Sequence, residues 1–257
     1  MAESYTPAEL MVVAAAREIK DGEVVFVGMR LPLLAFSLAK RTHAPNAIGL
    51  FENGLVRDTQ PPPDIYTMSD SPNIVGAAWA TGLIEIMSLL QRGDVDLGFI
   101  GGAEIDRHGN INTNLIGTRE RPRTWIKLPG SGGGADIACL ARRLVSLMRH
   151  EPHRLRERVD FITSPGFGDD GPAWRARQGL VRGGPSAVIT TLGVLRFDPG
   201  DGEAYLASYH PFTTVEEVQA KTGWPLRVAE WCQPTPEPTA DELRLIREAD
   251  PHGFWTR

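Results

Sequence analysis

The sequence predicts an α/β fold with an open, mixed and largely parallel sheet and flanking helices, formed by residues 1–257 as a single domain. Short apolar runs that are typical of buried strands alternate with helical patterns in the first half of the chain. A chain of this length can bury a large apolar core without disulfides or metals. No internal repeat, low-complexity tract or Ser/Gly linker divides it.

The first half of the chain has a strand–turn–helix rhythm. Thr6 and Glu9 flank Pro7 with the spacing of a capping box, which starts the first helix. Residues 57–75 contain three consecutive prolines and therefore form a long ordered loop or flap. The predicted elements are a helix from Pro7 to Asp21-Gly22, a strand at 24–27, a helix at 32–40, a strand at 47–51, a helix at 82–91 and a strand at 95–100.

The second half is richer in strands. Turn residues at 106–110 predict a hairpin, and the Gly-rich run at 130–134 opens a short helix. We expect the later strands to complete or flank the same sheet. The remaining predicted elements are strands at 144–148, 159–163, 187–191, 193–197 and 205–208, and short helices capped at Thr213-Thr214 and Thr239.

Composition narrows the choice of partners and compartment. The formal net charge is −5, from 27 basic and 32 acidic residues. The chain therefore lacks the excess of positive charge that binds the nucleic-acid backbone, and we expect small-molecule or protein partners. Cys139 and Cys232 are too few for a disulfide framework or a four-ligand zinc site, which favours a reducing, cytoplasmic setting. Neither a signal peptide nor a transmembrane segment is expected.

Glu52 is the first candidate catalytic residue. It follows an apolar strand directly and precedes Asn53-Gly54, so it lies at the carboxyl edge of the sheet, where open α/β folds bind ligands. Glu-Asn-Gly is also a common tight-turn tripeptide, because Asn and Gly tolerate positive φ. On these residues alone, the position is either a presented carboxylate or a surface turn.

The run Gly130-Ser131-Gly132-Gly133-Gly134 is the second candidate. Its small side chains let backbone N–H groups approach an anion or a developing oxyanion. It matches neither a P-loop nor a dinucleotide fingerprint, and a plain flexible loop remains open as an alternative.

Histidines offer a possible metal site. His150 and His153 form the one close pair, but Pro152 between them prevents the regular helix that such a ligand pair needs. We interpret the pair as part of a solvated turn and expect no metal.

Five segments occur along the chain in a characteristic order: Val-Gly-Met-Arg-Leu-Pro-Leu at 27–33, Phe-Glu-Asn-Gly-Leu at 51–55, Phe-Ile-Gly-Gly-Ala-Glu-Ile-Asp-Arg-His-Gly-Asn-Ile-Asn at 99–112, Gly-Ser-Gly-Gly-Gly at 130–134 and Thr-Ser-Pro-Gly at 163–166. This order resembles the class I coenzyme A transferases, and more closely the β subunits of the glutaconate CoA-transferase type. The resemblance extends over nearly the whole chain.

The resemblance implies an α/β fold shared by α and β subunits, with the active site between them and a nucleophilic glutamate, here Glu52, from the β subunit. It implies a ping-pong mechanism through a mixed anhydride and a glutamyl-CoA thioester. The expected partner is a separate α subunit, in a heterodimer or a dimer of heterodimers. The CoA thioester is a substrate, and no permanently bound cofactor is expected.

Further residues are assigned by the same resemblance. The backbone N–H of Gly133, or of its neighbour Gly134, is the implied oxyanion donor and CoA contact. Arg107 is implied as a cation for the CoA phosphates. The other implied CoA-contacting or substrate-contacting residues are Gly102, Ala103 and Gly132.

The chain departs from the family at three positions. Arg30 stands where other members keep a small residue, and it either binds the distal carboxylate of a dicarboxylic acid or faces solvent. Glu104 stands where some members have Gln. Phe26 stands where some members have a side-chain amide, so one oxyanion donor of those members is missing.

Two alternatives to the transferase remain. The fold resembles that of cofactor-free decarboxylases of glutaconyl-type thioesters and of hydrolases that open a carbon ring in steroid breakdown, but both lack the nucleophilic glutamate. Glu52 therefore favours the transferase. The second alternative is a non-catalytic chain that only completes its partner's site, with Glu52 as a turn residue.

Overall fold

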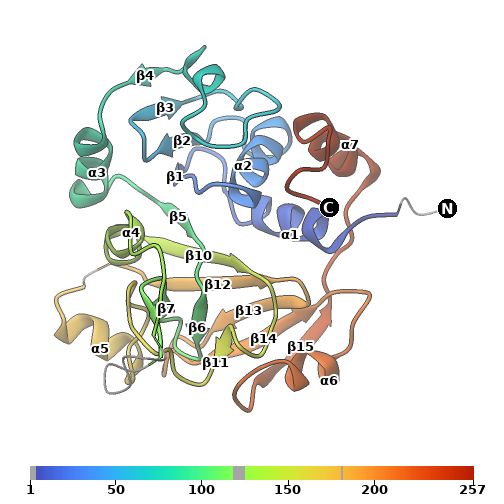
Figure 1. Cartoon of the computed structure of the whole chain (residues 1–257). Coiled ribbons are helices and arrows are strands. Elements are labelled where there is room, and N and C mark those ends of the chain that lie inside the picture. The colour runs from blue at the N-terminus through green and yellow to red at the C-terminus, as the bar shows by residue number, and fades with distance from the viewer. Residues whose placement is uncertain (1–3, 118–124, 181) are drawn as a thin grey trace. The chain divides into compact units, whose positions relative to one another are not determined.

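The computed structural model describes residues 4–117, 125–180 and 182–257 (Figure 1). The backbone divides into two compact units. Unit 1 comprises Met1–Phe99 and Pro236–Arg257, and unit 2 comprises Ile100–Thr235. The single domain expected over residues 1–257 stays a prediction. Within the described ranges, no helix is long and apolar enough to cross a lipid bilayer.

Unit 1 contains five adjacent strands in the order β5-β1-β2-β3-β4. β1 is parallel to β2 and to β5, whereas β2 with β3 and β3 with β4 are antiparallel. The carboxyl ends of β1, β2 and β5 therefore lie at one edge, which we call the carboxyl edge of unit 1. The strands are β1 (Val24–Phe26), β2 (Ile48–Phe51), β3 (Leu55–Arg57), β4 (Trp79–Ala80) and β5 (Leu97–Ile100).

Helices lie on both sides of these strands. Figure 1 shows α1 (Pro7–Ala16), α2 (Leu31–Arg41) and α7 (Ala240–Ala249) together on one side and α3 (Leu83–Arg92) on the other. α1 is buried all round because it is apolar throughout after its first turn. It starts with the predicted capping box but ends at Ala16, before the predicted end at Asp21-Gly22. Gly22, at φ +79°, lies in the turn that leads into β1.

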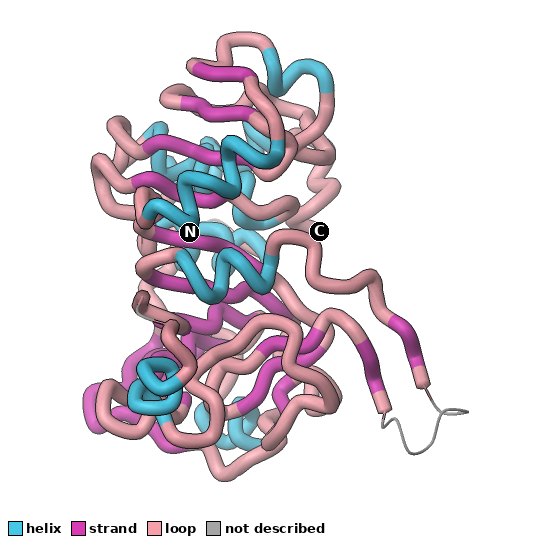
Figure 2. The backbone as a smooth tube through the Cα atoms, turned by 90° about the vertical axis from the view of Figure 1, so that its left-hand side faces the viewer, coloured by secondary structure: helices cyan, strands magenta, loops and turns pink. Residues whose placement is uncertain are grey.

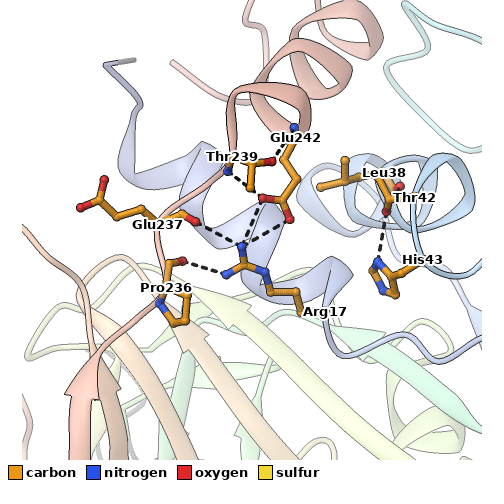
Figure 3. Close-up of polar contacts among 8 residues, drawn as sticks. All are labelled: Arg17, Leu38, Thr42, His43, Pro236, Glu237, Thr239 and Glu242. Carbon is orange, nitrogen blue, oxygen red and sulfur yellow. Dashed lines mark hydrogen bonds and ion pairs between the residues drawn. The ribbon is translucent and has the colours of Figure 1, made fainter. Parts of the chain in front are cut away.

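Hydrogen bonds and an ion pair connect α7 and the residues before it to the end of α1. The guanidinium of Arg17, at the end of α1, donates to the carbonyls of Pro236 and Glu237 at 2.8 and 3.2 Å (Figure 3). It also pairs with Glu242 at 3.2 Å. Glu242 closes the capping box that the sequence predicts with Thr239 at the start of α7. Residues 236–257 are therefore an integral part of unit 1, although they come last in the chain.

Unit 2 contains five adjacent strands in the order β15-β14-β13-β12-β10. β10 is parallel to β12 and β14 to β15, whereas β13 is antiparallel to both of its neighbours. Val145 of β10, Ile189 of β12 and Leu206 of β14 are fully buried, whereas β15 is largely exposed. The strands are β10 (Arg143–Met148), β12 (Pro185–Thr190), β13 (Gly193–Phe197), β14 (Ala204–Tyr209) and β15 (Arg227–Pro234).

Smaller elements complete unit 2. The predicted hairpin is formed by β6 (Glu104–Asp106) and β7 (Ile111–Asn112), and β11 (Leu155–Arg156) lies parallel to β6. β8 (Leu115–Ile116) and β9 (Ile126–Lys127) form a ribbon that projects from the rest of the unit (Figure 2). The helices are α4 (Gly134–Leu140), α5 (Gly171–Arg177) and α6 (Val215–Ala220).

The predicted α/β class with a mixed sheet is confirmed, but unit 2 differs from the prediction. β8, β9, β11 and α5 are additional elements, and two further differences concern residues 159–163 and β15. Residues 159–163 are not a strand, because their backbone groups bond to separate partners: the Asp160 N–H donates to the Glu104 carboxylate at 3.1 Å, and the Thr163 N–H donates to the Ile111 carbonyl at 2.9 Å. β15 is absent from the prediction, since its largely exposed sequence Arg-Val-Ala-Glu-Trp-Cys-Gln-Pro lacks an alternating apolar pattern.

Two buried histidines form a polar network in unit 2. His150, expected in a solvated turn, is only 3% exposed, because hydroxyls of Thr190 and Thr222, each 2.9 Å away, satisfy both ring nitrogens. His210 is fully buried, and its Nε2 lies 2.8 Å from the Thr190 carbonyl oxygen. Burial lowers the pKa of both histidines to about 4. The interpretation of a solvated turn is therefore wrong for His150.

The free energy of unfolding should fall as the pH drops from 6.5 towards 4. The folded chain keeps His150 and His210 neutral, while the unfolded chain protonates them below pH 6.5, so added protons favour unfolding in this window. Between pH 6.5 and 5 we expect a loss of about 2 kcal/mol for each histidine in urea titrations. The double variant His150→Gln, His210→Gln should lose this slope, and an unchanged slope would contradict the assignment.

Candidate active site

The Glu52 turn connects β2 to β3 as a three-residue hairpin loop. Gly54 has φ +107°, and its N–H donates to the Phe51 carbonyl at 3.0 Å. A Cβ at Gly54 would lie 2.1 Å from the Thr81 carbonyl oxygen, so only glycine fits there. Glu52 is half-buried and directly follows fully buried Phe51. The structure thus places this carboxylate at the carboxyl edge of unit 1, as the sequence predicts.

The end of β1 reaches the same edge. The Val27 N–H donates to the Leu50 carbonyl at 2.9 Å, which extends the pairing of β1 with β2 by one residue. A Cβ at Gly28 would lie 3.2 Å from the Phe99 carbonyl oxygen of β5. Three chain segments therefore approach closely at this edge. Phe26, one residue earlier, is 1% exposed and belongs to the apolar core of unit 1.

Segment 57–80 leads from the end of β3 to β4 through one turn of 3-10 helix at Ser71–Ile74, and it is tied to the Glu52 turn. Asn53 Nδ2 donates to the Met68 carbonyl at 3.0 Å, and Asn73 Nδ2 donates to the same carbonyl at 2.8 Å. Arg57 is 4% exposed, and its guanidinium donates to the Val75 carbonyl at 2.9 Å. Side-chain hydrogen bonds to backbone carbonyls thus hold the segment in place, which agrees with the ordered loop that the sequence predicts at 57–75.

Arg30 begins α2 in an unusual backbone conformation. Its φ is +66°, a region that costs a non-glycine residue about 1–3 kcal/mol. The side chain is exposed, and its Cζ lies 5.2 Å from the centroid of the Trp255 ring, in cation–π contact. Among the described residues, the guanidinium has no carboxylate partner. The structure thus leaves this cation accessible near the end of β1.

The Arg30→Gly variant should be more stable than the Arg30→Ala variant by about 1 kcal/mol. Both variants lose the contact with Trp255, but only glycine adopts a φ of +66° without strain. Urea unfolding of the two variants measures the difference. Equal stabilities would mean that the backbone relaxes when the arginine is removed.

The glycine-rich run adjoins two other segments of unit 2. The Gly130 N–H donates to the Thr113 carbonyl at 2.9 Å, just beyond β7. A Cβ at Gly134 would lie 3.3 Å from Ser164 Oγ, in the Thr-Ser-Pro-Gly segment. The Gly134 N–H donates to the Ser131 carbonyl at 2.9 Å within the run itself. Because the Ile111 N–H also donates to the Ser164 carbonyl at 2.9 Å, the structure brings together three of the segments that carry the family resemblance.

The turn at 106–110 presents Arg107. The buried Asp106 carboxylate accepts from the N–H groups of His108 and Asn110, each at 3.0 Å. Burial raises the pKa of Asp106, and the hydrogen bonds from Asn110 offset part of this effect. Arg107 lies between Asp106 and His108 in this anchored turn and is half-exposed, 3.8 Å from Glu157. Glu157 also lines a cavity of about 250 Å³, together with Pro152, Arg156, Arg158 and Gly223.

Glu104 has a structural environment. It is 2% exposed and accepts from Asn112 Nδ2 at 2.7 Å. Arg156 Nε lies 3.8 Å from the same carboxyl group. These contacts stabilise the hairpin that follows Gly102 and Ala103. The Ala103 N–H also donates to the Asn112 carbonyl at 2.9 Å.

The candidate residues are distributed over both units. Glu52 and Arg30 belong to unit 1, and the glycine-rich run, Gly102, Ala103 and Arg107 belong to unit 2. Sequence reasoning assigned no role in the site to Asp106, Asn110 or Trp255. In the structure, Asp106 and Asn110 are bonded within the Arg107 turn, and Trp255 contacts Arg30. Among the described residues, no group of three His, Cys, Asp or Glu side chains is arranged to hold a metal ion.

Comparison with known proteins gives consistent matches over the whole length. Residues 8–221 match the coenzyme A transferase family. The chain is 37% identical over 245 residues to the B subunit of 3-oxoadipate CoA-transferase from Pseudomonas knackmussii, covering 95% of this chain and 93% of that protein. It is 37% identical over 252 residues to the B subunit of glutaconate CoA-transferase from Acidaminococcus fermentans, covering 95% and 92%. The crystal structure of glutaconate coenzyme A-transferase from that organism superposes with a TM-score of 0.90 at 33% identity, covering 99% and 98%.

Similar proteins with other activities have lower identity. The crystal structure of the decarboxylase AibA/AibB superposes with a TM-score of 0.83 at 30% identity, covering 98% of this chain and 97% of that chain. The cholesterol ring-cleaving hydrolase IpdB subunit of Rhodococcus jostii is 26% identical over 261 residues, covering 98% and 95%.

Proposed function

This chain belongs to the class I coenzyme A transferase family as a subunit of the B type, and from that premise we propose that it moves CoA between carboxylic acids through Glu52. The observation that carries the proposal is the position of Glu52, which a glycine-dependent hairpin turn holds directly after a buried strand at the carboxyl edge of unit 1. Open α/β folds bind their ligands at such edges.

The proposed reaction has four steps. The Glu52 carboxylate attacks the thioester carbonyl of an acyl-CoA, and the C–S bond breaks to give a mixed anhydride and CoA thiolate. The thiolate then attacks the glutamyl carbonyl and releases the first acid, which leaves a glutamyl-CoA thioester. A second carboxylate attacks this thioester and expels CoA thiolate again, and the thiolate finally attacks the acyl carbonyl of the new anhydride. Glu52 is regenerated as a carboxylate.

Each attack creates an oxyanion, for which we assign the backbone N–H of Gly133 as donor. The neighbouring Gly134, whose N–H donates to the Ser131 carbonyl, is the alternative donor that the family resemblance also allows. Arg107 is assigned to the CoA phosphates because the anchored turn presents its guanidinium next to a cavity that also contains Arg156 and Arg158. We assign Gly102, Ala103, Gly132 and Gly134 to contacts with CoA or substrate.

A dicarboxylic acid is the proposed substrate class. The two relatives at 37% identity are named for glutaconate and for 3-oxoadipate, and both acids carry two carboxylates. Arg30 supports this class, because an accessible guanidinium without a carboxylate partner among the described residues suits a second carboxylate.

The proposed partner is the A subunit of the same transferase, in the cytoplasm. Both relatives are named as B subunits, and the AibA/AibB structure has two named components. Unit 1 also exposes large apolar side chains from residues 74 to 84, which are typical of surfaces that associate. They are Ile74, Val75, Trp79, Leu83 and Ile84, with exposures of 54, 76, 47, 51 and 79%.

The test traps the covalent intermediate. The purified complex of this chain with its A subunit is incubated with acyl-CoA and then treated with borohydride or hydroxylamine, and the modified peptide is identified by mass spectrometry. We expect the modification on Glu52, together with exchange of CoA into added acid. CO2 release or ring opening without an acceptor acid, and no modification of Glu52, would instead support the decarboxylase or hydrolase alternative. No covalent adduct and no turnover of any kind would support the non-catalytic alternative.

A further inference from the structure

We propose that Trp255, in the segment after α7, is a positioning residue for Arg30 and thereby sets the preference of the enzyme for acids with a second carboxylate. The inference rests on the proposed function, in which Arg30 binds that carboxylate. Trp255 lies beyond the residues that match the family, 8–221, and outside every segment that carries the resemblance. The family match therefore assigns Trp255 no role.

Arg30 combines a strained backbone with an accessible charge. Its positive φ belongs to a class of strain that concentrates at functional sites. Arg30 Cζ lies over the Trp255 ring, 5.2 Å from its centroid, in cation–π contact. The ring face offers the guanidinium no hydrogen-bond acceptor, so its N–H groups are available to form paired hydrogen bonds with a carboxylate. The contact thus restricts a flexible side chain without using its donors.

Trp255 is held in place by Asp250, which is 7% exposed. The carboxylate accepts from the N–H groups of Phe254, Trp255 and Thr256 at 2.7, 3.0 and 3.1 Å. The Thr256 carbonyl in turn accepts from the Thr6 hydroxyl at 2.6 Å, at the start of α1. The ring is therefore fixed to unit 1 before a substrate binds, which reduces the entropy cost of ordering Arg30.

Two further rings connect Trp255 with segment 57–80. The rings of Phe254 and Trp255 are T-shaped with centroids 4.4 Å apart, and those of Tyr66 and Phe254 are 4.6 Å apart. Within the described structure, the buried Trp255 Nε1 has no hydrogen-bond partner. A hydrogen bond from the indole therefore does not explain a tryptophan at this position. Its aromatic face does explain it, because among side chains tryptophan provides the best face for a cation.

The test measures acceptor preference in the complex with the A subunit, using one fixed acyl-CoA donor and either glutarate or butyrate as acceptor. We expect Trp255→Leu to raise the KM for glutarate about tenfold, with kcat and the KM for butyrate within twofold of wild type. Trp255→Phe should retain most of the glutarate preference. Trp231→Leu is the matched control, because Trp231 is 66% exposed on β15 in unit 2 and should leave both acceptors unchanged.

A double-mutant cycle separates this inference from the proposed function. The double variant Arg30→Leu, Trp255→Leu should have the same glutarate KM as Arg30→Leu alone, and the two substitutions should also couple in the midpoint of urea unfolding. Two results would overturn the inference while CoA transfer itself persists. One is that Trp255→Leu changes the KM for glutarate and the KM for butyrate equally. The other is that the effects of the two substitutions are additive both in the glutarate KM and in the midpoint of urea unfolding. Coupling in urea but no CoA transfer by the wild type would overturn the proposed function, and the acid preference with it.

Discussion

Replacing Glu52 with glutamine should lower the rate of CoA transfer by about 10⁴-fold or more. The amide oxygen is a poor nucleophile, and it forms neither the mixed anhydride nor the glutamyl-CoA thioester that the two half-reactions require. Glu52→Asp keeps the carboxylate but withdraws it by one methylene from the edge where the turn presents it. A displacement of about 1 Å typically costs about 10²-fold, so we expect an intermediate rate for this variant. Steady-state transfer by the assembled complex gives both values.

The matched control is Glu230→Gln, a substitution at an exposed glutamate on β15 of unit 2. It removes the same charge and should leave transfer unchanged. Binding of the A subunit, measured by size-exclusion chromatography, should be the same for all three variants. Full transferase activity in the Glu52→Gln complex would refute the nucleophilic role.

The Gly54→Ala substitution should reduce both stability and activity. The added Cβ would lie 2.1 Å from the Thr81 carbonyl oxygen, and a φ of +107° is strained for any residue with a side chain. We expect a loss of about 2–4 kcal/mol in the free energy of unfolding. Because the turn has to shift to relieve the contact, Glu52 moves with it, and transfer should fall by about 10²-fold. Urea unfolding and the transfer assay measure the two effects.

Gly22→Ala provides the control for backbone strain. Gly22 also has a positive φ, +79°, but no atom lies within 4 Å of its added Cβ. This variant should lose only about 1 kcal/mol and retain full activity. Similar losses at both glycines would mean that the contact with Thr81, and hence the close fit of the Glu52 turn, has no energetic role.

The sequence predicts best those features that depend on near neighbours. Both capping boxes, at Thr6 and at Thr239, are present because their bonds connect residues three positions apart. The same holds for the Glu52 turn, whose conformation follows from Asn53-Gly54 after an apolar strand. Residues 159–163 show the limit of this reasoning, because apolar residues there suggest a strand while distant side chains and loops take up the backbone hydrogen bonds.

Several residues around the candidate site have no recognisable signal in the sequence. Nothing in the sequence distinguishes Arg57 from other arginines, whereas in the fold its guanidinium donates to backbone carbonyls. The neighbours Glu151 and Pro152 suggest that His150 is solvated, but in the fold the hydroxyls of two threonines bond its ring. The contact between Arg30 and Trp255 joins positions at opposite ends of the chain. Pairs of this kind are decided by packing, for which local patterns carry no information.

The amino-acid sequence alone determined the α/β class, the family and the presentation of Glu52 after a buried strand, because apolar periodicity, capping and turn chemistry act over a few residues. Only the tertiary structure decided which side chains support that carboxylate and its neighbours. Asp250 orders the turn that holds Trp255, and Trp255 in turn faces a strained Arg30. These contacts exist only after the C-terminal segment packs against the first two helices, since burial and long-range hydrogen bonds arise when remote parts of the chain meet.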